Sequence, residues 1–399
     1  MRCRRTVTGI LLAALAVVPS LSAQSTPRTA ARATGDRLPI ALDGLLHPVV
    51  VSARVPAMGA ALVTHQGVLA IGAAGRRDAR RTERVTRDDQ WHIGSCGKAI
   101  SAVVVARLVA KGVLRWESTV AELWPDSARH PAWNAVTVEQ LLSHRGGMSA
   151  NPDDALWEAA VRSNTSLPAQ RARVARGLFA AAPTAPVDSV TLYSNAAYLA
   201  VGAMVERRTG VDWELLVRRE VFHPLAMRRS GFGAPRVPRP GSQARGHIDA
   251  RSGVYPVRLG VGSDNPPAGG PVGTIHLPLD DWSTFIATVL RGARGDTTYL
   301  PAAQWQRLLT PRPNADYALG WKVVRDSSLQ RFTLEHVGSN GFWIAQASLS
   351  PDAGIAVLLT ANAAVDRLEQ PFDRLRRLLA DSASAWCVGD RCRGATVTR

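Results

Sequence analysis

The order of helix-like and strand-like segments along the chain is the feature that most constrains its fold. Apolar β-rich runs lie near both ends, between 59 and 72 and again between 319 and 360. Helical patterns occupy most of the chain between them and also flank the two ends, at 38–51, 99–110, 136–142, 155–180, 195–209, 212–222, 279–292 and 365–380. A sheet built from both chain ends, with a helical insertion in the middle, is the most economical arrangement. The predicted fold class is therefore α+β, an antiparallel sheet flanked by helices with a central, mainly helical lobe.

The segment from Ala99 to Ala110 is predicted to be a helix buried in the middle of the protein. Small and β-branched apolar residues occupy nearly every face of it, which leaves no polar face for solvent. It ends at Lys111 and Gly112, a cation followed by the residue type that commonly terminates helices. Residues 233–272, by contrast, are rich in Gly, Pro and Arg and are expected to form long loops.

The first 23 residues have the pattern of a secretory signal peptide. Arginines at positions 2, 4 and 5 precede the apolar run Gly9–Val18, and small residues follow it, with cleavage expected after Ser22 or Ala23. The apolar run is shorter than the roughly 20 residues that a membrane-spanning helix needs, and no later segment is long and apolar enough. We therefore expect an exported protein, periplasmic or secreted, without a stable membrane span.

Three regions are expected after removal of the signal peptide at residues 1–23. Residues 24–37 lack periodicity and are predicted to be disordered, residues 38–381 to form the folded domain, and residues 382–399 to form a C-terminal tail. An oxidising compartment would allow Cys387 and Cys392 in this tail to form a short-loop disulfide. Cys96 is then left over, and we expect it to be a buried free thiol.

The excess of positive charge does not by itself indicate a nucleic-acid partner. The chain carries 48 Lys and Arg against 32 Asp and Glu, a net charge of +16. Only Lys98, Lys111 and Lys322 are lysines, and the arginines are scattered instead of gathered in one run. Since nucleic-acid sites need a basic patch or stripe, no nucleic acid is predicted as a partner. An arginine-rich surface binder is a third, weaker hypothesis, which predicts salt-dependent retention on an anionic matrix.

Ser95, followed three residues later by Lys98 at the start of the buried helix, is the strongest candidate for chemistry. Residues i and i+3 share a helix face, and the free N–H groups of a helix N-terminus favour a developing alkoxide or oxyanion. An apolar setting lowers the pKa of a lysine, so that Lys98 can accept the proton of a nucleophilic serine. The alternative is a solvated lysine on a surface helix, and the apolar run Ala102–Ala106 argues against it.

Tyr193 and Asn195 form a second candidate motif, directly before the helix predicted at 195–209. A phenol beside the serine and lysine can relay a proton to the leaving group. An asparagine two residues further on can hold the lysine and a substrate amide. Considered alone, these residues would more simply cap the helix.

A third motif contains His336, Gly338 and Ser339, between two predicted strands. The glycine would let a substrate lie against a strand edge, and the Ser339 N–H could complete an oxyanion hole with the N–H of Ser95. Considered alone, His336 would more simply be a histidine in a turn.

The three motifs, in this order, resemble those of the penicillin-recognising serine hydrolases, in particular the branch with class C β-lactamases, D-Ala-D-Ala carboxypeptidases, D-aminopeptidases and related esterases. The resemblance runs from about Leu42 to Leu379 and implies a β-lactamase/transpeptidase-like fold. It also implies one role for each motif residue: Ser95 as nucleophile, Lys98 and Tyr193 as proton-transfer pair, Asn195 as contact to substrate and lysine, and His336 with Gly338 as the strand motif.

Two residues depart from the family pattern. Gly97 weakens the first helical turn after the serine. His336 stands where class C β-lactamases carry lysine, which argues against efficient β-lactam hydrolysis. Because histidine titrates near neutrality, it should also make carboxylate recognition depend on pH.

Other kinds of site match the sequence less well. There is no Gly-x-Ser-x-Gly elbow, since Ile93 precedes Ser95 and Val337 precedes Ser339 at the first glycine position. Neither a metal-binding His/Cys cluster nor a glycine-rich phosphate loop stands out, so no metal or cofactor is expected.

The leading prediction is an exported serine hydrolase that cleaves an amide or ester bond through a Ser95 acyl-enzyme. Its substrate would be a small molecule or peptide, such as a D-amino peptide, a β-lactam or an ester, and loops at 148–190 and 233–270 should shape the pocket. The alternative is a catalytically silent penicillin-binding-like protein that binds peptidoglycan or a partner. Retention of Ser95, Lys98 and Tyr193 argues against this alternative.

Overall fold

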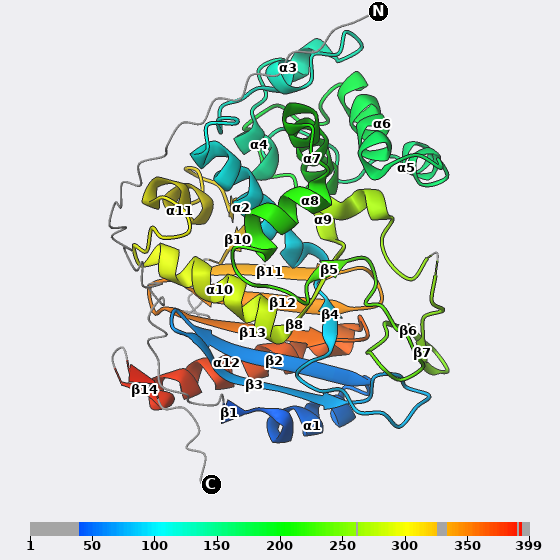
Figure 1. The fold of residues 1–399 in the computed structure, drawn as a ribbon, viewed down its shortest axis with the longest axis vertical. Helices are drawn as coiled ribbons and strands as arrows, with labels where there is room; N and C mark the ends of the chain where they lie inside the picture. Colours follow the sequence, from blue (N-terminus) through cyan, green and yellow to red (C-terminus); the bar gives the residue numbers. More distant parts are fainter. Residues whose placement is uncertain (1–39, 261, 325–332, 389–390, 393–399) are drawn as a thin grey trace, which may run out of the picture. The chain divides into compact units, whose positions relative to one another are not determined.

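A sheet built from both ends of the chain forms the centre of the fold (Figure 1). The structure is a computed structural model that describes residues 40–260, 262–324, 333–388 and 391–392. Within these ranges the sheet has eight strands in the order β1-β3-β2-β13-β12-β11-β10-β9. They are β1 (Ile40–Ala41), β2 (Ala57–Thr64), β3 (Gly67–Gly75), β9 (Tyr317–Ala318), β10 (Trp321–Val323), β11 (Leu334–Ser339), β12 (Ile344–Ser350) and β13 (Ile355–Ala361).

Strands from the two chain ends meet where β2 pairs with β13. The pairing is antiparallel and places Ile355 opposite Thr64 and Ala361 opposite Met58. The other neighbouring strands are also antiparallel, except that the short β1 runs parallel to β3. These pairings confirm the predicted α+β class and the sheet formed from both chain ends.

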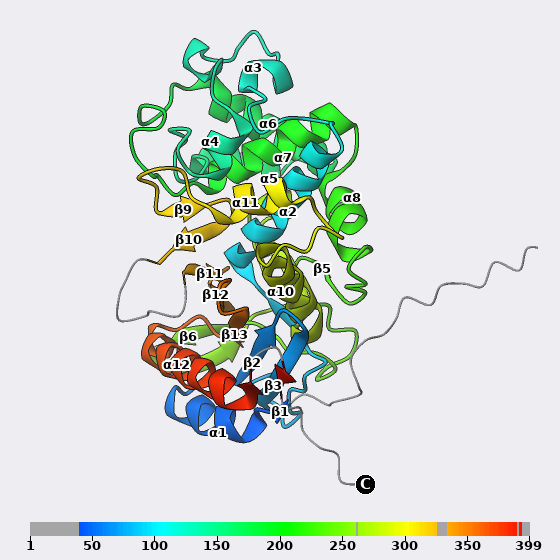
Figure 2. The same ribbon diagram turned by 90° about the vertical axis from the view of Figure 1, so that its left-hand side faces the viewer.

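Two helices cover one face of this sheet, α1 (Asp43–Ser52) and α12 (Glu369–Trp386) (Figure 2). The buried residues of β2 alternate, so that Met58 and Leu62 belong to the core under these helices whereas Ala61 and Val63 belong to the core on the opposite face. Both faces of β2 are apolar because both are covered. The core under the two helices includes Leu46, Val50, Phe372, Leu375 and Leu379.

The opposite face packs against α10 (Leu279–Ala293) and the helical lobe. At the centre of this lobe lies α2 (Gly97–Ala110), in which nearly every residue is buried, as predicted for 99–110. The other helices of the lobe are α3 (Val120–Leu123), α4 (Val138–Leu142), α5 (Asp154–Val161), α6 (Leu167–Ala180), α7 (Asn195–Thr209), α8 (Trp213–Val217), α9 (Gly270–Gly273) and α11 (Ala302–Leu309).

The structure differs from the sequence prediction in three segments. The helix expected at 38–51 begins only at Asp43, because Ile40 and Ala41 pair with β3 as strand β1. The helix expected at 155–180 is divided into α5 and α6, because Ser166 and Pro168 have the residue types that begin a new helix. The loops expected at 233–272 contain the hairpin β6 (His247–Ala250) and β7 (Gly253–Pro256).

Near the C-terminus, β14 (Cys387–Val388) pairs with β15 (Arg391–Cys392) and places the two cysteines opposite each other. Their disulfide stays a prediction, because the structure does not describe these two side chains. The predicted signal peptide and the predicted disordered segment lie outside the described residues, which begin at Ile40. No helix among the residues that the structure describes is both long and apolar enough to span a membrane.

Candidate active site

Ser95 lies in a single turn of 3-10 helix, Gly94–Cys96, between strand β4 (Gln90–His92) and helix α2. Two glycines from other elements allow the backbone of this turn to pack closely. A Cβ atom on Gly338 of β11 would lie 2.0 Å from the Ile93 carbonyl oxygen and 2.4 Å from the Ser95 nitrogen. One on Gly273 of α9 would lie 2.6 Å from the Gly94 carbonyl oxygen. Ser95, the predicted nucleophile, is therefore held between the sheet and the helical lobe.

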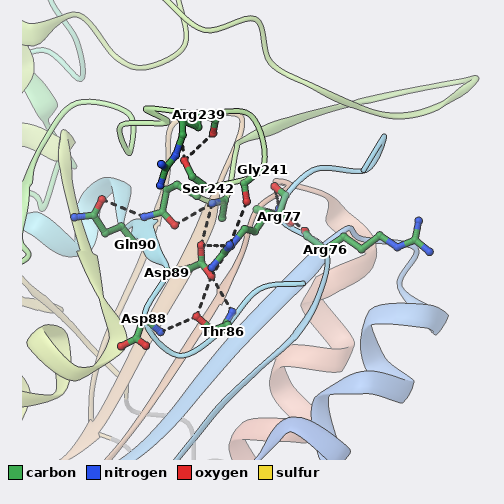
Figure 3. A network of polar contacts seen from close by, with 12 residues as sticks. Arg76, Arg77, Thr86, Asp88, Asp89, Gln90, Arg239, Gly241 and Ser242 are labelled. Atoms are coloured by element: carbon green, nitrogen blue, oxygen red, sulfur yellow. Dashed lines mark hydrogen bonds and ion pairs between the residues drawn. The ribbon is translucent and has the colours of Figure 1, made fainter. Parts of the chain in front are cut away.

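A polar network fixes the chain just before β4 (Figure 3). The Asp89 carboxylate accepts hydrogen bonds from Arg77 Nε at 2.9 Å, from the Thr86 N–H at 2.8 Å and from the Ala244 N–H at 3.1 Å. Arg77 also donates to the Gly241 carbonyl at 3.1 Å. The network joins the segment before β4 to the loop around 239–245. The Asp89 side chain at its centre is only 1% exposed, so this link lies inside the protein.

Lys98 is fully buried, and its amine has three polar contacts. Its Nζ lies 3.1 Å from Ser95 Oγ, 2.8 Å from Asn195 Oδ1 and 3.2 Å from the Val272 carbonyl oxygen. Burial lowers the pKa of Lys98 to about 7. A neutral amine has two N–H donors and one lone pair, which suits two carbonyl acceptors and the Ser95 hydroxyl as a donor. The geometry thus permits Lys98 to take the proton of Ser95.

Tyr193 lies beside this pair and is 40% exposed. Lys98 Nζ lies 5.0 Å from the centre of the Tyr193 ring. Burial of the phenol raises the pKa of Tyr193 to about 12, and a hydrogen bond with Ser95 partly opposes that rise. Tyr193 is therefore a neutral phenol at neutral pH, which can both accept and donate a proton.

Asn195 is the first residue of α7, and its amide connects two parts of the site. Its Oδ1 accepts from Lys98, and its Nδ2 donates to Asn151 Oδ1 at 2.8 Å. The cap of the helix is the residue before it, because Ser194 Oγ accepts from the Ala197 N–H at 2.9 Å. Ser194, and not Tyr193 or Asn195, therefore caps the helix. The Asn195 amide is free to accept the hydrogen bond from Lys98.

An aromatic shell, which the sequence did not predict, surrounds the lysine. The ring of His144 lies 4.5 Å from that of Tyr193 and 4.3 Å from that of Tyr317. The Ser194 N–H donates to His144 Nδ1 at 3.1 Å. Burial lowers the pKa of His144 well below its usual value, and Lys98 adds to this effect, so the ring is neutral. The only indication of His144 in the sequence was its place within the range, about Leu42 to Leu379, over which the chain resembles the family.

His336 lies within β11, as the strand motif of the family resemblance implies, and not in a turn, which was the simpler interpretation of this residue considered alone. Its Nδ1 donates to the Val337 carbonyl at 2.8 Å, which leaves Nε2 to accept from the Tyr317 hydroxyl at 2.9 Å. Burial lowers the pKa of His336 to about 3. The expectation that this histidine titrates near neutrality is therefore wrong for the free protein, and its role in substrate binding stays a prediction. The ring is neutral, and both of its nitrogens have protein partners.

The Ser339 backbone directly adjoins the turn Gly94–Cys96. A Cβ atom on Gly94 would lie 2.2 Å from the Ser339 nitrogen, and Gly94 itself has a positive φ of 54°. This proximity brings the N–H groups of Ser95 and Ser339 into one region, as an oxyanion hole requires.

Behind the turn, Cys96 is a buried free thiol, as predicted, and it donates to the His336 carbonyl at 3.2 Å.

A second polar group, also not predicted, joins the segment at 262–266 to the turn Gly94–Cys96 that carries Ser95. The Gly94 N–H donates to His92 Nδ1 at 3.2 Å, and His92 Nε2 lies 2.9 Å from Asp264 Oδ1. The same carboxylate oxygen accepts from Asn340 Nδ2 at 2.7 Å. One aspartate therefore connects this loop, the turn before Ser95 and the end of β11.

Ser95 and Ser339 open onto a cavity of about 340 Å³. Its lining combines apolar side chains, three asparagine amides and a single acid: Trp157, Leu199, Val272, Asn151, Asn195, Asn265 and Asp154. Among the described residues, no group of three or more His, Cys, Asp or Glu side chains is arranged to hold a metal ion. The arrangement suits acyl transfer to a serine with an organic substrate in the cavity.

Comparisons with known proteins agree with this geometry. A family model described as Beta-lactamase matches residues 42–382. Penicillin-binding protein 4 of Amycolatopsis lactamdurans is 25% identical over 358 residues, which cover 85% of this chain and 83% of that protein. Esterase EstB of Burkholderia gladioli is 27% identical over 53% of this chain, and the match spans 56% of that esterase.

A solved structure shows the same fold. The D-amino acid amidase of Ochrobactrum anthropi SV3, crystallised with L-phenylalanine, superposes with a TM-score of 0.68 and 20% identity. The match covers 86% of this chain and 99% of that one. The relatives carry different activities in their names, so they identify a family and not a substrate. Because the family model spans most of the sequence and the motif residues of the resemblance converge on one site, this chain belongs to the Beta-lactamase family of serine hydrolases.

Proposed function

We propose that the protein is an exported serine hydrolase that cleaves an amide or ester through an acyl-enzyme on Ser95. The observation that carries the proposal is the environment of Lys98. Its amine lies 3.1 Å from Ser95 Oγ, its other two contacts are neutral carbonyl oxygens, and burial lowers its pKa to about 7. A lysine held this way is a base for the serine hydroxyl near neutral pH.

In the acylation step, Ser95 Oγ attacks the substrate carbonyl carbon while its proton passes to Lys98. The developing oxyanion accepts hydrogen bonds from the N–H groups of Ser95 and Ser339. Collapse of the tetrahedral intermediate breaks the bond to the leaving group and leaves an ester on Ser95. The Tyr193 phenol, which is neutral because its pKa is raised to about 12, carries the proton from Lys98 to the departing nitrogen or oxygen.

In the deacylation step, water takes the place of the leaving group. Its proton passes to the same pair, Lys98 and Tyr193, and its oxygen attacks the ester carbonyl. The second tetrahedral intermediate then collapses and returns the proton to Ser95 Oγ, which releases the acid and restores the free enzyme.

The proposed compartment is the periplasm or the extracellular space. It is supported by the charged, then apolar, then small-residue order of the first 23 residues. The expected substrate is a small molecule or peptide, because the cavity beside Ser95 measures about 340 Å³. The names of its relatives, a penicillin-binding protein, an esterase and an amidase, support ester, amide and β-lactam compounds as the classes to test.

A substrate panel tests this proposal. Short-chain p-nitrophenyl esters, amino-acid amides, D-Ala-D-Ala peptides and nitrocefin would be given to the wild type and to Ser95→Ala. Turnover of at least one class by the wild type, with a loss of at least about 10³-fold in kcat in Ser95→Ala, is the expected result.

The second candidate is a catalytically silent protein that binds peptidoglycan or a partner. It predicts no turnover of any panel compound together with tight binding of muropeptides. The contacts of Lys98 with Ser95 and Asn195 disfavour it, since a binding protein would have no need of a buried lysine beside a serine hydroxyl. Turnover that survives unchanged in Ser95→Ala would contradict the proposed mechanism itself.

A further inference from the structure

His144 occupies a backbone position that helices usually give to glycine. It lies two residues after the end of helix α4 and has a φ of 59°, in the left-handed region. Its N–H donates to the Leu141 carbonyl at 3.2 Å, and the Arg145 N–H donates to the Gln140 carbonyl at 2.8 Å. These two bonds form a Schellman motif, which glycine completes at a lower conformational cost than a residue with a Cβ atom. The presence of an imidazole here therefore requires a separate reason.

Burial adds a second cost to this side chain. His144 is 1% exposed, and its Nδ1 accepts the Ser194 N–H, so the proton of the neutral ring is on Nε2. Nε2 has no hydrogen-bond partner among the residues that the structure describes. A buried donor without a partner is unfavourable, and an apolar side chain of similar size would avoid it. What the histidine provides, and an apolar residue would not, is the acceptor at Nδ1.

This acceptor and the His144 carbonyl bind the backbone on both sides of Tyr193. The Leu192 N–H donates to the His144 carbonyl at 2.8 Å, and the Ser194 N–H donates to Nδ1 at 3.1 Å. The imidazole also packs against the Tyr193 ring, with the ring centres 4.5 Å apart. Residues 191–194 belong to no helix or strand, and the Tyr193 side chain is 40% exposed, so regular structure does not fix this phenol. Contacts with His144 hold it instead.

The position of the phenol matters because proton transfer requires hydrogen-bond reach. In the proposed mechanism Tyr193 carries a proton from Lys98 to the leaving group, and a displacement of about 1 Å can cost about 10²-fold in rate. The imidazole is itself held by Tyr317, whose ring centre lies 4.3 Å away. The Tyr317 hydroxyl donates to His336 Nε2 at 2.9 Å, which anchors this contact to β11.

We propose that His144 is a positioning residue for the acyl transfer: it fixes the Tyr193 phenol where that phenol can protonate the leaving group. His144 acts through Tyr193 and does not line the cavity beside Ser95. This inference rests on the proposed acyl-enzyme function and adds a residue to it. Loss of the imidazole should slow substrates whose leaving group needs a proton and spare those whose leaving group departs as a stable anion.

Two esters of one acyl group test this dependence on the leaving group. The acyl group is that of the best ester or amide in the substrate panel. Its p-nitrophenyl ester releases a stable anion, whereas its ethyl ester releases an alkoxide that must be protonated. In His144→Gly, the ratio of kcat/KM for the p-nitrophenyl ester to kcat/KM for the ethyl ester should rise about 10- to 100-fold. Glycine removes the imidazole but suits the Schellman motif, so the variant should fold.

Two further comparisons separate positioning from a merely structural role. His144→Asn places an acceptor oxygen as many bonds from Cα as Nδ1, and asparagine tolerates left-handed backbone, so its ratio should stay within about threefold of the wild type. Tyr193→Phe should raise the ratio at least as much as His144→Gly does. Adding His144→Gly to Tyr193→Phe should then change the ratio by no more than about twofold, because a residue that acts through Tyr193 has nothing left to position.

Ala226→Gly is the matched control. Ala226 has a φ of 54° and is exposed, so this change relieves the same backbone conformation without removing a contact of the proposed site. Its ratio should equal that of the wild type. An unchanged ratio in His144→Gly, an equal loss for both esters, or a further rise in the double variant would overturn the assignment.

Labelling of Ser95 separates failure of this inference from failure of the proposed function. A fluorophosphonate expels fluoride, which needs no proton donor, so His144→Gly should label within about threefold of the wild-type rate. A larger loss would show that the imidazole supports Ser95 or Lys98 and would overturn the assignment. If the wild type is labelled but turns over neither ester, the inference alone is overturned. If the wild type is not labelled, the acyl-enzyme proposal fails and the inference fails with it.

Discussion

Lys98 is the residue on which the proposed chemistry depends most. It is fully buried, and no carboxylate is among its hydrogen-bond partners in the described structure; its three contacts are a hydroxyl and two carbonyl oxygens. Aromatic rings complete its surroundings, with Tyr193 and Tyr198 centred 5.0 and 5.6 Å from its Nζ. None of these groups supplies a full negative charge, so the amine has no salt bridge to stabilise its charged form. Burial therefore lowers the pKa of the amine to about 7.

This pKa predicts the pH dependence of acylation. The neutral amine is the reactive form, so the rate at which a fluorophosphonate labels Ser95 should rise with pH and level off above about 7. Lys98→Arg retains a positive charge that does not titrate in this range, and it should label at least about 10²-fold more slowly at every pH. A labelling rate that falls between pH 6 and 8, or that is equal in Lys98→Arg, would contradict this role.

The same residue should also make folding stability depend on pH. Between about 7 and the ordinary value of 10.5, the unfolded chain binds a proton on Lys98 that the folded protein does not bind. The free energy of unfolding should therefore rise with pH in this window, by up to about 1.4 kcal/mol per pH unit from this group.

Lys98→Met isolates that contribution, because it removes the titrating group and keeps a similar side-chain volume. Urea unfolding at pH 7.5, 8.5 and 9.5 should show a steeper rise in the wild type than in the variant. Equal slopes would show that the lysine is charged in the folded protein.

At the scale of elements, the position of the turn Gly94–Cys96 depends on a glycine in a neighbouring strand. Gly338 of β11 allows the backbone at Ile93 and Ser95 to lie in direct contact with the sheet. The three nearest atoms that a methyl group would meet belong to backbone, at 2.0, 2.4 and 2.8 Å, so none can move away as a flexible side chain would. The strand thus fixes the position of the Ser95 N–H.

Gly338→Ala should therefore damage both stability and catalysis. Overpacking of this kind costs about 1–3 kcal/mol or more, and a displacement of about 1 Å at Ser95 should lower kcat/KM about 10²-fold. Gly44→Ala is the control, since a Cβ atom there meets nothing within 4 Å in helix α1. It should keep full activity and gain about 0.5–1 kcal/mol. Denaturant unfolding and steady-state kinetics of the two variants check this, and normal activity in Gly338→Ala would contradict it.

The elements that could be predicted from the sequence are those with strong local patterns. The apolar run in α2 indicated a buried helix, and the spacing of Ser95 and Lys98 placed both at its start, where the structure has them 3.1 Å apart. The distribution of strands along the chain predicted one sheet built from both chain ends, which the pairing of β2 with β13 confirms, but it did not predict which strands pair.

The remainder of the site depends on contacts between distant loops. His144 itself has a φ of 59°, and its ring lies 4.5 Å from that of Tyr193. Helix α5 begins where the sequence predicted a helix, but no pattern placed its first turn at the cavity beside Ser95. His336 was assigned a titration that its burial prevents, because burial is a property of the packed strand and not of the motif. No local pattern in the sequence specifies these arrangements.

At the scale of the whole molecule, the sheet separates two cores. The core under α1 and α12 includes Leu46 and contains none of the residues of the proposed site, whereas the core on the other face includes Cys96 and α2. This division predicts that stability and catalysis can be changed separately.

Leu46→Ala should lower the free energy of unfolding by about 2–5 kcal/mol, because the side chain is completely buried. Its kcat/KM per labelled active site should stay equal to that of the wild type. Val51→Ala, on the same helix and 63% exposed, is the control and should change stability by no more than about 0.5 kcal/mol. Thermal unfolding and active-site titration give both quantities, and a parallel loss of kcat/KM in Leu46→Ala would show that the two cores are coupled.

Trapping the acyl-enzyme on Ser95 is the most direct test of the proposed hydrolysis. The protein would be mixed with an acylating ester or a β-lactam, quenched in acid within seconds, and analysed by intact-mass and peptide mass spectrometry. We expect a mass increase equal to one acyl group on the peptide that contains Ser95, and no increase in Ser95→Ala. An adduct that persists in Ser95→Ala, or turnover of substrate without any adduct on the Ser95 peptide, would contradict it.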